Sequence, residues 1–427
     1  MSNSYIPIDT NLDVQSGFAF PSTSFEENGI PIVRMSDLKA GKLVFNNTKY
    51  VSDQWLKTAS PFTLKSGDFL MGMSGSLTNF AIVSDDDIPS LLNQRVGRLK
   101  LKNTTVNYNY VCYWLKSEKY GCYAEIQGEG AAQKNISAKQ IGQFLYRDAP
   151  ILEQKKIAFI LQAIDQTIEK TEALIEKHKQ IKAGLMHDLF TRGITADGKL
   201  RPPREQAPEL YQETPSGWIP KDWQYGELKE FVRSAQYGIS TSLSDIETGI
   251  PVLRMNNIQS NMFDVTDLKY TNDIEAYRIK LKSGDVLYNR TNSMEHVGKT
   301  AIWRDELDSC SFASYLVRIN LHEDMLLSEY FSHWMSLDSS QIAIRRYATP
   351  AVQQVNINPT NLQKITISCP IDLAEQKLIV ARLDSIDDKL NREKEKLGKM
   401  NYQKSGLMHD LLTGKVPVAI NDGETND

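Results

Sequence analysis

The strongest constraint on the fold is an internal repeat that runs through nearly the whole chain. The word GLMHDL occupies Gly184–Leu189 and recurs at Gly406–Leu411, an offset of 222 residues (406 − 184). IPIVRM at Ile30 and IPVLRM at Ile250 lie 220 residues apart (250 − 30), and other shared words keep similar offsets. A nearly constant offset indicates a tandem duplication. We expect GLMHDL to recur because each copy must fit the same kind of partner.

Each half of the chain reads as a globular domain followed by a long helix. Runs such as IPIVRM, VGRLKL and SYLVRINL are separated by Gly, Asn, Ser and Pro, which is typical of strands and turns. Helical stretches at Tyr110–Ser117 and Leu327–Ser336 lie between these runs. The predicted class is therefore α+β, with two mixed α/β domains separated by two long helices.

The segment after each domain repeats apolar residues every seven positions, which favours a coiled coil. A helix of about 38 residues would be about 57 Å long. Both copies become polar at Thr171 and Glu393, and again at Lys182 and Lys404. Buried polar positions of this kind fix the register of the pairing, and we expect antiparallel helices with internal pseudo-two-fold symmetry. The predicted contact positions are Ile157, Leu161, Ile164, Ile168, Leu185, Ile379, Leu383, Ile386, Leu390 and Leu407.

The length of 427 residues predicts two or three domains. Pro202, Pro203, Pro208, Pro215 and Pro220 mark a linker that cannot be helical throughout. The expected boundaries are 1–148 for the first globular domain, 149–194 for the first helix, 195–225 for the linker, 226–368 for the second globular domain, 369–416 for the second helix and 417–427 for a polar tail.

The composition narrows the class of protein. No apolar run is long enough to cross a bilayer, and the first residues lack the pattern of a signal peptide, so we expect a cytoplasmic protein without a membrane partner. The four cysteines are scattered, which suits a reducing compartment and gives no zinc spacing. A net charge of −4 argues mildly against a generic nucleic-acid binder, but it allows a local basic surface.

The short motifs give little support for catalysis. NPTN at Asn358–Asn361 lacks the second proline and the aromatic residue of an adenine methyltransferase, and GKT at Gly298–Thr300 lacks the earlier glycine of a phosphate loop. Asp372, Glu375 and Lys377 resemble a metal-nuclease signature, but acids also favour the start of a helix. The six histidines show no metal-ligand spacing. We expect no catalytic residue and no metal site in this chain.

The EQK-containing helices, both GLMHDL words and PSGWIPKDW at the start of the second domain resemble the specificity subunits of Type I restriction–modification systems. The resemblance covers nearly the whole chain, although the first domain begins near residue 15 without a counterpart of PSGWIPKDW. It implies a non-catalytic subunit in which each globular domain is a target-recognition domain for half of a bipartite, asymmetric site in double-stranded DNA.

The same resemblance implies that the paired helices set the spacing between the half-sites. They would also dock two modification (methyltransferase) subunits, and restriction subunits (translocase and nuclease) would join that complex. No cofactor is expected in this chain, because S-adenosylmethionine and ATP would bind in the partner subunits.

Candidate DNA contacts come from polar segments of each domain, since Arg pairs with guanine, Asn and Gln pair with adenine, and smaller polar groups bind phosphates. YNRTN at 288–292 is expected to be a loop. Met73 stands where the second domain has Arg290, so the halves should read different sequences. Arg34 and Arg254 recur in the RM word, and either a phosphate contact or a core ion pair would explain them. The candidates are Tyr288, Asn289, Arg290, Thr291, Asn292, Arg345, Arg346, Tyr347, Gln353, Gln354, Arg34, Arg254, Ser74, Ser76, Thr78, Asn79, Gln133 and Lys134.

Three other interpretations remain open. The chain could be a coiled-coil scaffold without a DNA role, the recognition subunit of a related Type II system, or an autonomous enzyme. Binding of a fixed bipartite site in the presence of the modification subunit separates recognition from scaffolding. Methylation or cleavage by the purified chain alone would support an enzyme.

Overall fold

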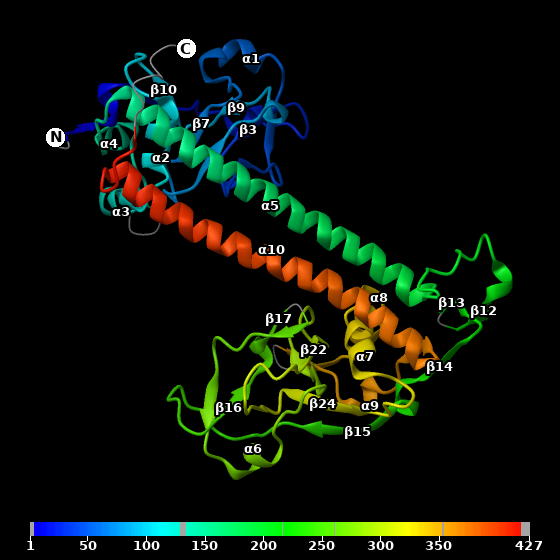
Figure 1. Ribbon diagram of the computed structural model, residues 1–427. Helices are drawn as coiled ribbons and strands as arrows, with labels where there is room; N and C mark the ends of the chain where they lie inside the picture. The colour runs from blue at the N-terminus through cyan, green and yellow to red at the C-terminus, as the bar shows by residue number, and fades with distance from the viewer. Residues whose placement is uncertain (1–3, 129–133, 216, 260, 352–353, 420–427) are drawn as a thin grey trace. The chain divides into compact units, whose positions relative to one another are not determined.

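The computed structural model describes residues 4–128, 134–215, 217–259, 261–351 and 354–419 (Figure 1). The chain divides into two compact units. Unit 1 comprises residues 1–172 and 395–427, and unit 2 comprises residues 173–394. Each unit therefore contains one of the predicted globular domains together with part of each long helix, because the helices are divided between the units instead of standing outside them.

Unit 1 is built on an antiparallel sheet of order β2-β10-β7-β8 and a three-stranded sheet of order β6-β3-β9. Its first strand, β1, is short and pairs with β11, so the fold of this unit includes residues that precede residue 15. The strands are β1 (Tyr5–Pro7), β2 (Leu12–Ser16), β3 (Ile30–Val33), β4 (Leu38–Lys39), β5 (Lys42–Leu43), β6 (Lys49–Val51), β7 (Phe69–Gly72), β8 (Phe80–Ile82), β9 (Leu91–Leu92), β10 (Val96–Leu101) and β11 (Leu145–Arg147). The helices are α1 (Trp55–Thr58), α2 (Tyr108–Leu115), α3 (Glu118–Gln127) and α4 (Ala138–Gly142).

Unit 2 repeats this plan, with sheets of order β15-β24-β20-β22 and β19-β16-β23. The runs IPIVRM, VGRLKL and SYLVRINL form β3, β10 and β24, and the helical stretches form α2 and α7, so these predictions are confirmed. The strands are β12 (Tyr211–Thr214), β13 (Gly217–Pro220), β14 (Trp223–Glu227), β15 (Val232–Tyr237), β16 (Ile250–Leu253), β17 (Ile258–Gln259), β18 (Met262–Phe263), β19 (Lys269–Thr271), β20 (Val286–Asn289), β21 (Thr291–Asn292), β22 (Thr300–Ile302), β23 (Ser311–Phe312), β24 (Leu316–Leu321), β25 (Thr349–Ala351), β26 (Gln354–Asn356) and β27 (Thr366–Pro370). The helices are α6 (Ile274–Arg278), α7 (Ser328–Met335), α8 (Asp338–Arg345) and α9 (Pro359–Leu362).

The word SGD, at Ser66–Asp68 and again at Ser283–Asp285, supplies a partner for a buried arginine in each unit. In unit 1, Arg98 of β10 pairs with Asp68 at 3.0 Å and also donates to Gln15. In unit 2, Arg318 of β24 pairs with Asp285 at 2.5 Å and donates to Gln236 in the same way. A buried charge is tolerated only when it is paired and hydrogen-bonded, so SGD recurs because each sheet needs the same carboxylate.

The EQK words recur for a related reason. Gln154 accepts a hydrogen bond from the Asn107 backbone N–H at 2.8 Å, which fixes the start of α5 to the start of α2. Gln376 accepts from the Leu327 N–H at 3.0 Å and fixes α10 to α7. The acid between Asp372 and Lys377, Glu375, is 7% exposed and bound in an ion pair. The EQK residues therefore have structural roles, because they join each long helix to the domain that precedes it.

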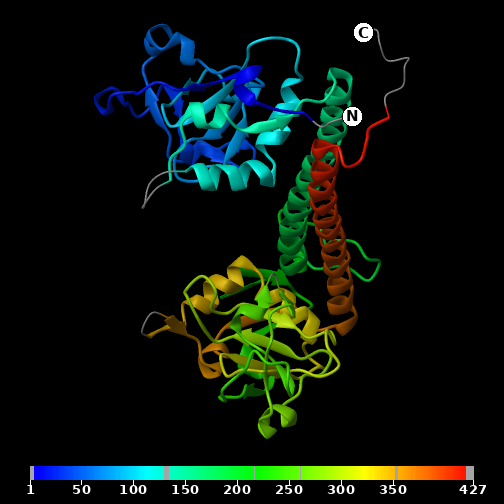
Figure 2. The same cartoon turned by 90° about the vertical axis from the view of Figure 1, so that its left-hand side faces the viewer.

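The two long helices are α5 (Ile151–Thr191) and α10 (Leu373–Thr413), each of 41 residues. They lie side by side in both views (Figure 1, Figure 2). In unit 1, Lys404 pairs with Asp165 at 2.7 Å, and in unit 2, Lys182 pairs with Asp387 at 2.5 Å. The start of one helix thus meets the end of the other within each unit, as expected for antiparallel pairing. Every predicted contact position is buried or half-buried: Ile157, Leu161, Ile164, Ile168, Leu185, Ile379, Leu383, Ile386, Leu390 and Leu407.

GLMHDL marks the end of each helix, where it enters the core of the other repeat's domain. At the end of α5, Met186, Leu189 and Phe190 are buried in the hydrophobic core of unit 2, and the Phe190 ring lies 4.9 Å from that of Tyr330. At the end of α10, Leu411 and Leu412 belong to the corresponding core of unit 1. The histidines of both words are exposed.

The proline-rich segment between the repeats is more ordered than a linker. It contains the hairpin β12–β13, and β14 pairs with β27 at the edge of the second domain. Arg201 of this segment is buried and pairs with Glu375 of α10. The segment is not helical throughout, as its prolines predict, and side chains between them anchor it to unit 2.

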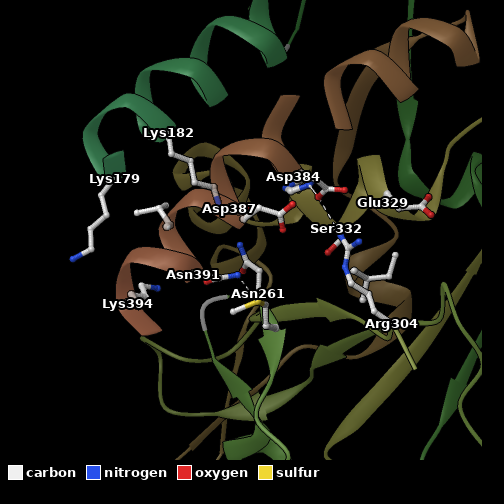
Figure 3. Close-up of a pocket in the computed structure, with 15 residues that line it drawn as sticks. Lys179, Lys182, Asn261, Arg304, Glu329, Ser332, Asp384, Asp387, Asn391 and Lys394 are labelled. Carbon is white, nitrogen blue, oxygen red and sulfur yellow. Dashed lines mark hydrogen bonds and ion pairs between the residues drawn. The ribbon is translucent and has the colours of Figure 1, made fainter. Parts of the chain in front are cut away.

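A polar hollow of about 520 Å³ lies where α5, α10, α7 and β22 meet in unit 2 (Figure 3). Asp384 of α10 is bonded to His333 Nε2 at 3.0 Å and to Arg304 at 3.1 Å. Burial acts to raise the pKa of Asp384, but the His333 hydrogen bond and the Arg304 charge outweigh it and hold the pKa below its usual range. Charges of both signs line this hollow, which indicates a structural junction.

Replacing Asp384 with asparagine is expected to lower the free energy of unfolding of unit 2 by about 1–3 kcal/mol at pH 7, since it removes a carboxylate that accepts charge-assisted hydrogen bonds. The folded-state pKa of Asp384 lies below the unfolded value near 4. Its contribution is therefore complete above about pH 4 and is lost as the pH falls through the folded pKa. Urea unfolding at pH 7 and pH 3 measures this, with the exposed Asp388→Asn as the control. A deficit that persisted undiminished at pH 3 would contradict the ion-pair explanation.

Candidate nucleic-acid interface

The structure joins the two polar segments of the second domain in one small sheet. β21 pairs with β26, placing Thr291 opposite Asn356 and Asn292 opposite Val355, and β25 pairs with the other edge of β26. The Thr291 hydroxyl also donates to the Asn356 side chain. The prediction of a loop over 288–292 is therefore wrong. The segment forms strands by pairing with Asn356, which lies 65 residues further along the chain, so nothing in the local sequence indicated it.

Three of the predicted contacts in this segment are inaccessible. Tyr288 is fully buried in β20, where its hydroxyl donates to the Ile357 carbonyl at 3.1 Å, and burial raises its pKa. Asn289 is fully buried, and Thr291 is nearly so. Neighbouring residues of a strand point to opposite faces of the sheet, and every residue of β20 is buried, so both faces of this strand are covered. Tyr288, Asn289 and Thr291 are thus removed as candidate DNA contacts.

The remaining candidates of the second domain reach solvent. Arg290 Nε donates to the Ser314 carbonyl at 2.9 Å, and its guanidinium carbon lies 5.1 Å from the centre of the Tyr237 ring. Arg345 donates to the Glu295 carbonyl at 3.2 Å. Among the described residues, the arginines of this group have no carboxylate within ion-pair distance. The accessible or half-accessible candidates are Arg290, Asn292, Arg345, Arg346, Tyr347 and Gln354.

Arg254 lies beside this group. Two hollows of about 480 and 470 Å³ share Met255 and Asn256 in their walls, and the first includes Arg254 and Tyr315 while the second includes Asn292. Arg254 pairs with the exposed Asp267 at 2.8 Å. Its ion pair is thus on the surface, not in the core, and it leaves the residue near the candidate contacts.

In unit 1 the counterpart segments are joined by the same backbone contacts. Ser74 bridges to Asn135, and the Gly75 N–H donates to the Lys134 carbonyl at 2.8 Å. Ser74 is only 3% exposed at this bridge. It is therefore also removed as a candidate contact. Ser76 donates to Asn79 at 3.1 Å.

Other first-domain candidates are on the surface. Thr78 is exposed, and Lys134 is exposed and paired with Glu125. Arg34 donates to the Asn47 carbonyl, and among the described residues it has no core ion pair either. Gln133 and Gln353 lie outside the described residues.

Three residues next to these candidates carry no signal in the sequence. Tyr237 and Tyr315 are 46% and 45% exposed and flank Arg290, and Arg95 is exposed at the matching place in unit 1. Tyr237 and Tyr315 are far from each other along the chain, and only the pairing of β15 with β24 brings them together. A comparison of the two repeats at these positions could have identified them.

Two absences concern only the part of the chain that the structure describes. There, no group of three or more His, Cys, Asp or Glu side chains is placed to hold a metal ion. Within the same residues, none of the helices combines the length and apolar character needed to cross a membrane.

Comparison with known proteins agrees with this arrangement of repeated domains. Residues 12–180 and 220–399 match the family described as Type I restriction modification DNA specificity domain. The Type I restriction enzyme EcoBI specificity subunit of Escherichia coli is 22% identical over 428 residues, covering 96% of this chain and 85% of that protein. The putative type I restriction enzyme MjaX specificity subunit of Methanocaldococcus jannaschii is 28% identical over 208 residues, covering 48% of this chain and about half (49%) of that protein.

Solved structures share the fold. The S subunit of a Type-I restriction-modification system from M. genitalium aligns with a TM-score of 0.59 at 12% identity, covering 98% of each chain. A chain from a structure of the type I R-M system, solved to explain complex assembly and conformational transition, aligns with a TM-score of 0.52 at 14% identity. That alignment covers 97% of this chain and 99% of the other.

Proposed function

Because the chain belongs to the family of Type I restriction modification DNA specificity domains and carries two copies of that domain, we propose that it is the non-catalytic DNA-recognition subunit of a Type I restriction–modification complex. The observation that carries the proposal is one sheet framework present twice, with different side chains at equivalent positions. Arg290 in unit 2 corresponds to Met73 in unit 1. Each domain would read one half of a bipartite, asymmetric site in double-stranded DNA.

We propose that the paired helices set the spacer between the half-sites and dock two modification subunits. Support comes from the length of α5 and α10, about 62 Å for 41 residues. Each helix also leaves a large side chain in solvent: Phe159 is 67% exposed and Tyr402 is 84% exposed. Restriction subunits would complete the complex in the cytoplasm. S-adenosylmethionine and ATP would bind in the partner subunits, and none of the chemistry would fall to this chain.

Mapping of methylated adenines tests this proposal directly. The chain would be expressed with its modification subunits in cells that lack other adenine methylation, and the modified positions would be sequenced. The expected result is a single bipartite motif with two unlike half-sites, because the two recognition surfaces differ. A palindromic motif would contradict the division of labour between the domains.

The scaffold interpretation is tested on the same purified complex. Direct phosphate contacts make affinity for DNA depend on salt, and six to ten such contacts correspond to a fall of about 10³- to 10⁵-fold between 50 and 200 mM salt. A complex that assembles through the helices but shows no such DNA binding would support a scaffold. Methylation by this chain alone, without the modification subunits, would instead indicate an enzyme.

A further inference from the structure

The two units hold a short structural motif with the same backbone contacts. The Arg290 N–H donates to the Tyr315 carbonyl at 2.9 Å, and the Ile357 N–H donates to the Arg290 carbonyl at 2.8 Å. In unit 1, Met73 takes the place of Arg290: its N–H donates to the Arg95 carbonyl at 3.1 Å, and its carbonyl accepts from the Ile136 N–H at 3.0 Å. Met73 and Arg95 are thus the structural equivalents of Arg290 and Tyr315.

A third position follows from the sheet register. Gln236 lies opposite Arg318 in unit 2, and Gln15 lies opposite Arg98 in unit 1. The next residues along these strands, Tyr237 and Ser16, are therefore equivalent. We name Tyr237, Arg290 and Tyr315 the unit 2 triad, and Ser16, Met73 and Arg95 the unit 1 triad. The backbone of the motif is shared, while all three side chains differ.

In the unit 2 triad the arginine is held at one end and free at the other. Its Nε donates to the Ser314 carbonyl at 2.9 Å, and its planar group lies over the exposed ring of Tyr237. Within the described residues, its two Nη groups have no hydrogen-bond partner. Holding Nε and one face of the guanidinium reduces the rotamer entropy lost when the Nη groups bind a ligand.

A free guanidinium fork matches the two acceptors that guanine presents in the major groove, O6 and N7. An ammonium group is a point charge and cannot make the two parallel hydrogen bonds. The exposed ring of Tyr237, over which the guanidinium lies, limits the directions from which a base pair can approach the fork.

The unit 1 triad cannot make the same contact in the same place. Met73 is 8% exposed and accepts a contact from the Ser16 hydroxyl at 3.6 Å, so this position offers no donor. In unit 1 a cation stands instead at Arg95, which is exposed in the turn just before β10. The two frameworks would therefore present different donor patterns to their half-sites.

From this geometry we propose that the unit 2 triad determines specificity for one guanine–cytosine pair in the half-site read by unit 2, with Arg290 binding guanine and Tyr237 orienting its guanidinium. The proposal rests on the proposed function and adds the base pair and the residues that select it.

The test uses the full chain in complex with its modification subunits and a DNA library randomised in both half-sites. Arg290→Lys and Arg290→Ala are expected to lower the preference for guanine at one position about 5- to 150-fold, the range for losing a bidentate contact. Preferences in the other half-site should not change. Tyr237→Ala is expected to weaken the preference for guanine at the same position. Tyr237→Phe keeps the ring and should show the wild-type preference. Arg233→Lys, at an exposed arginine on the same strand as Tyr237, is the matched control.

The outcomes separate this proposal from the one it rests on. A uniform loss of affinity across all sequences in Arg290→Lys and Arg290→Ala would identify a phosphate contact and overturn the triad, while leaving the proposed function intact. A preference for guanine in Arg290→Lys that equals that of the wild-type complex would also overturn the triad. If the complex with the wild-type chain showed no sequence preference, the proposed function itself would be contradicted. Thermal unfolding of each variant checks that the fold is retained.

Discussion

Replacing Phe190 with alanine is expected to destabilise unit 2 by about 3–5 kcal/mol, the usual cost of removing a buried phenylalanine. The effect should appear in the second repeat's domain although Phe190 belongs to the first repeat. The reason is that the end of α5 enters the core of unit 2, where Phe190 packs against Tyr330. Loss of the ring leaves a cavity that the surrounding side chains cannot fill completely.

Hydrogen exchange measures where the stability is lost. Amides of 226–368 should exchange faster in Phe190→Ala, and those of 4–128 should change little. Phe159→Ala is a matched control, because it removes the same side chain from an exposed position of the same helix. Leu412→Ala is the reciprocal variant, expected to cost unit 1 about 2–5 kcal/mol. Loss of protection confined to the first domain in Phe190→Ala would contradict this packing.

Features set by local periodicity could be predicted from the sequence. The seven-residue spacing identified positions that are buried or half-buried in α5 and α10, because apolar residues at this period can bury only one face of a helix. The polar exceptions were informative too. Lys182 and Lys404 were expected to fix the register, and each is paired with an aspartate of the other helix.

Features set by contacts distant in the chain could not be predicted. Tyr288 and Asn289 looked like members of a polar loop, but their neighbours in space come from β24 and Ile357, which give them a buried environment. Tyr237 and Tyr315 flank Arg290 for the same reason, since strand pairing brings them together. A single sequence shows residue types at these places but not which face of the sheet they occupy.

The proline-rich segment illustrates the same limit in a different way. Its composition predicted a linker, and nothing local indicated that Arg201 would be buried. The partner that makes burial possible, Glu375, lies 174 residues further along the chain. Burial acts to lower the pKa of Arg201, but the hydrogen bonds to Glu375 and Asp222 outweigh it and raise the pKa above its usual value.

Replacing Glu375 with alanine is therefore expected to cost unit 2 about 3–5 kcal/mol, the range for removing one partner of a buried ion pair. The carboxylate binds both Nη groups of Arg201, at 2.5 and 2.8 Å, and also accepts from the Ile194 N–H at 2.9 Å and from Trp223 Nε1 at 3.2 Å. Its removal leaves Arg201 with Asp222, which is largely exposed, as its carboxylate partner among the described residues. Urea unfolding of the chain measures the loss.

A double variant decides between two explanations of that loss. If the cost comes from an unpaired buried charge, adding Arg201→Met to Glu375→Ala should recover part of the stability, because a buried ion pair replaced by apolar side chains is often close to neutral. If Glu375 contributed mainly by packing, the double variant would be the less stable of the two. Glu153→Ala is the matched change in unit 1, where the partner is Arg147 at 2.8 Å. Glu375 belongs to the short sequence that resembles a metal-nuclease signature. A loss of stability in both Glu375→Ala and Glu153→Ala would show that the glutamates of both EQK sequences have structural roles. Normal stability in both variants would instead support a chemical role.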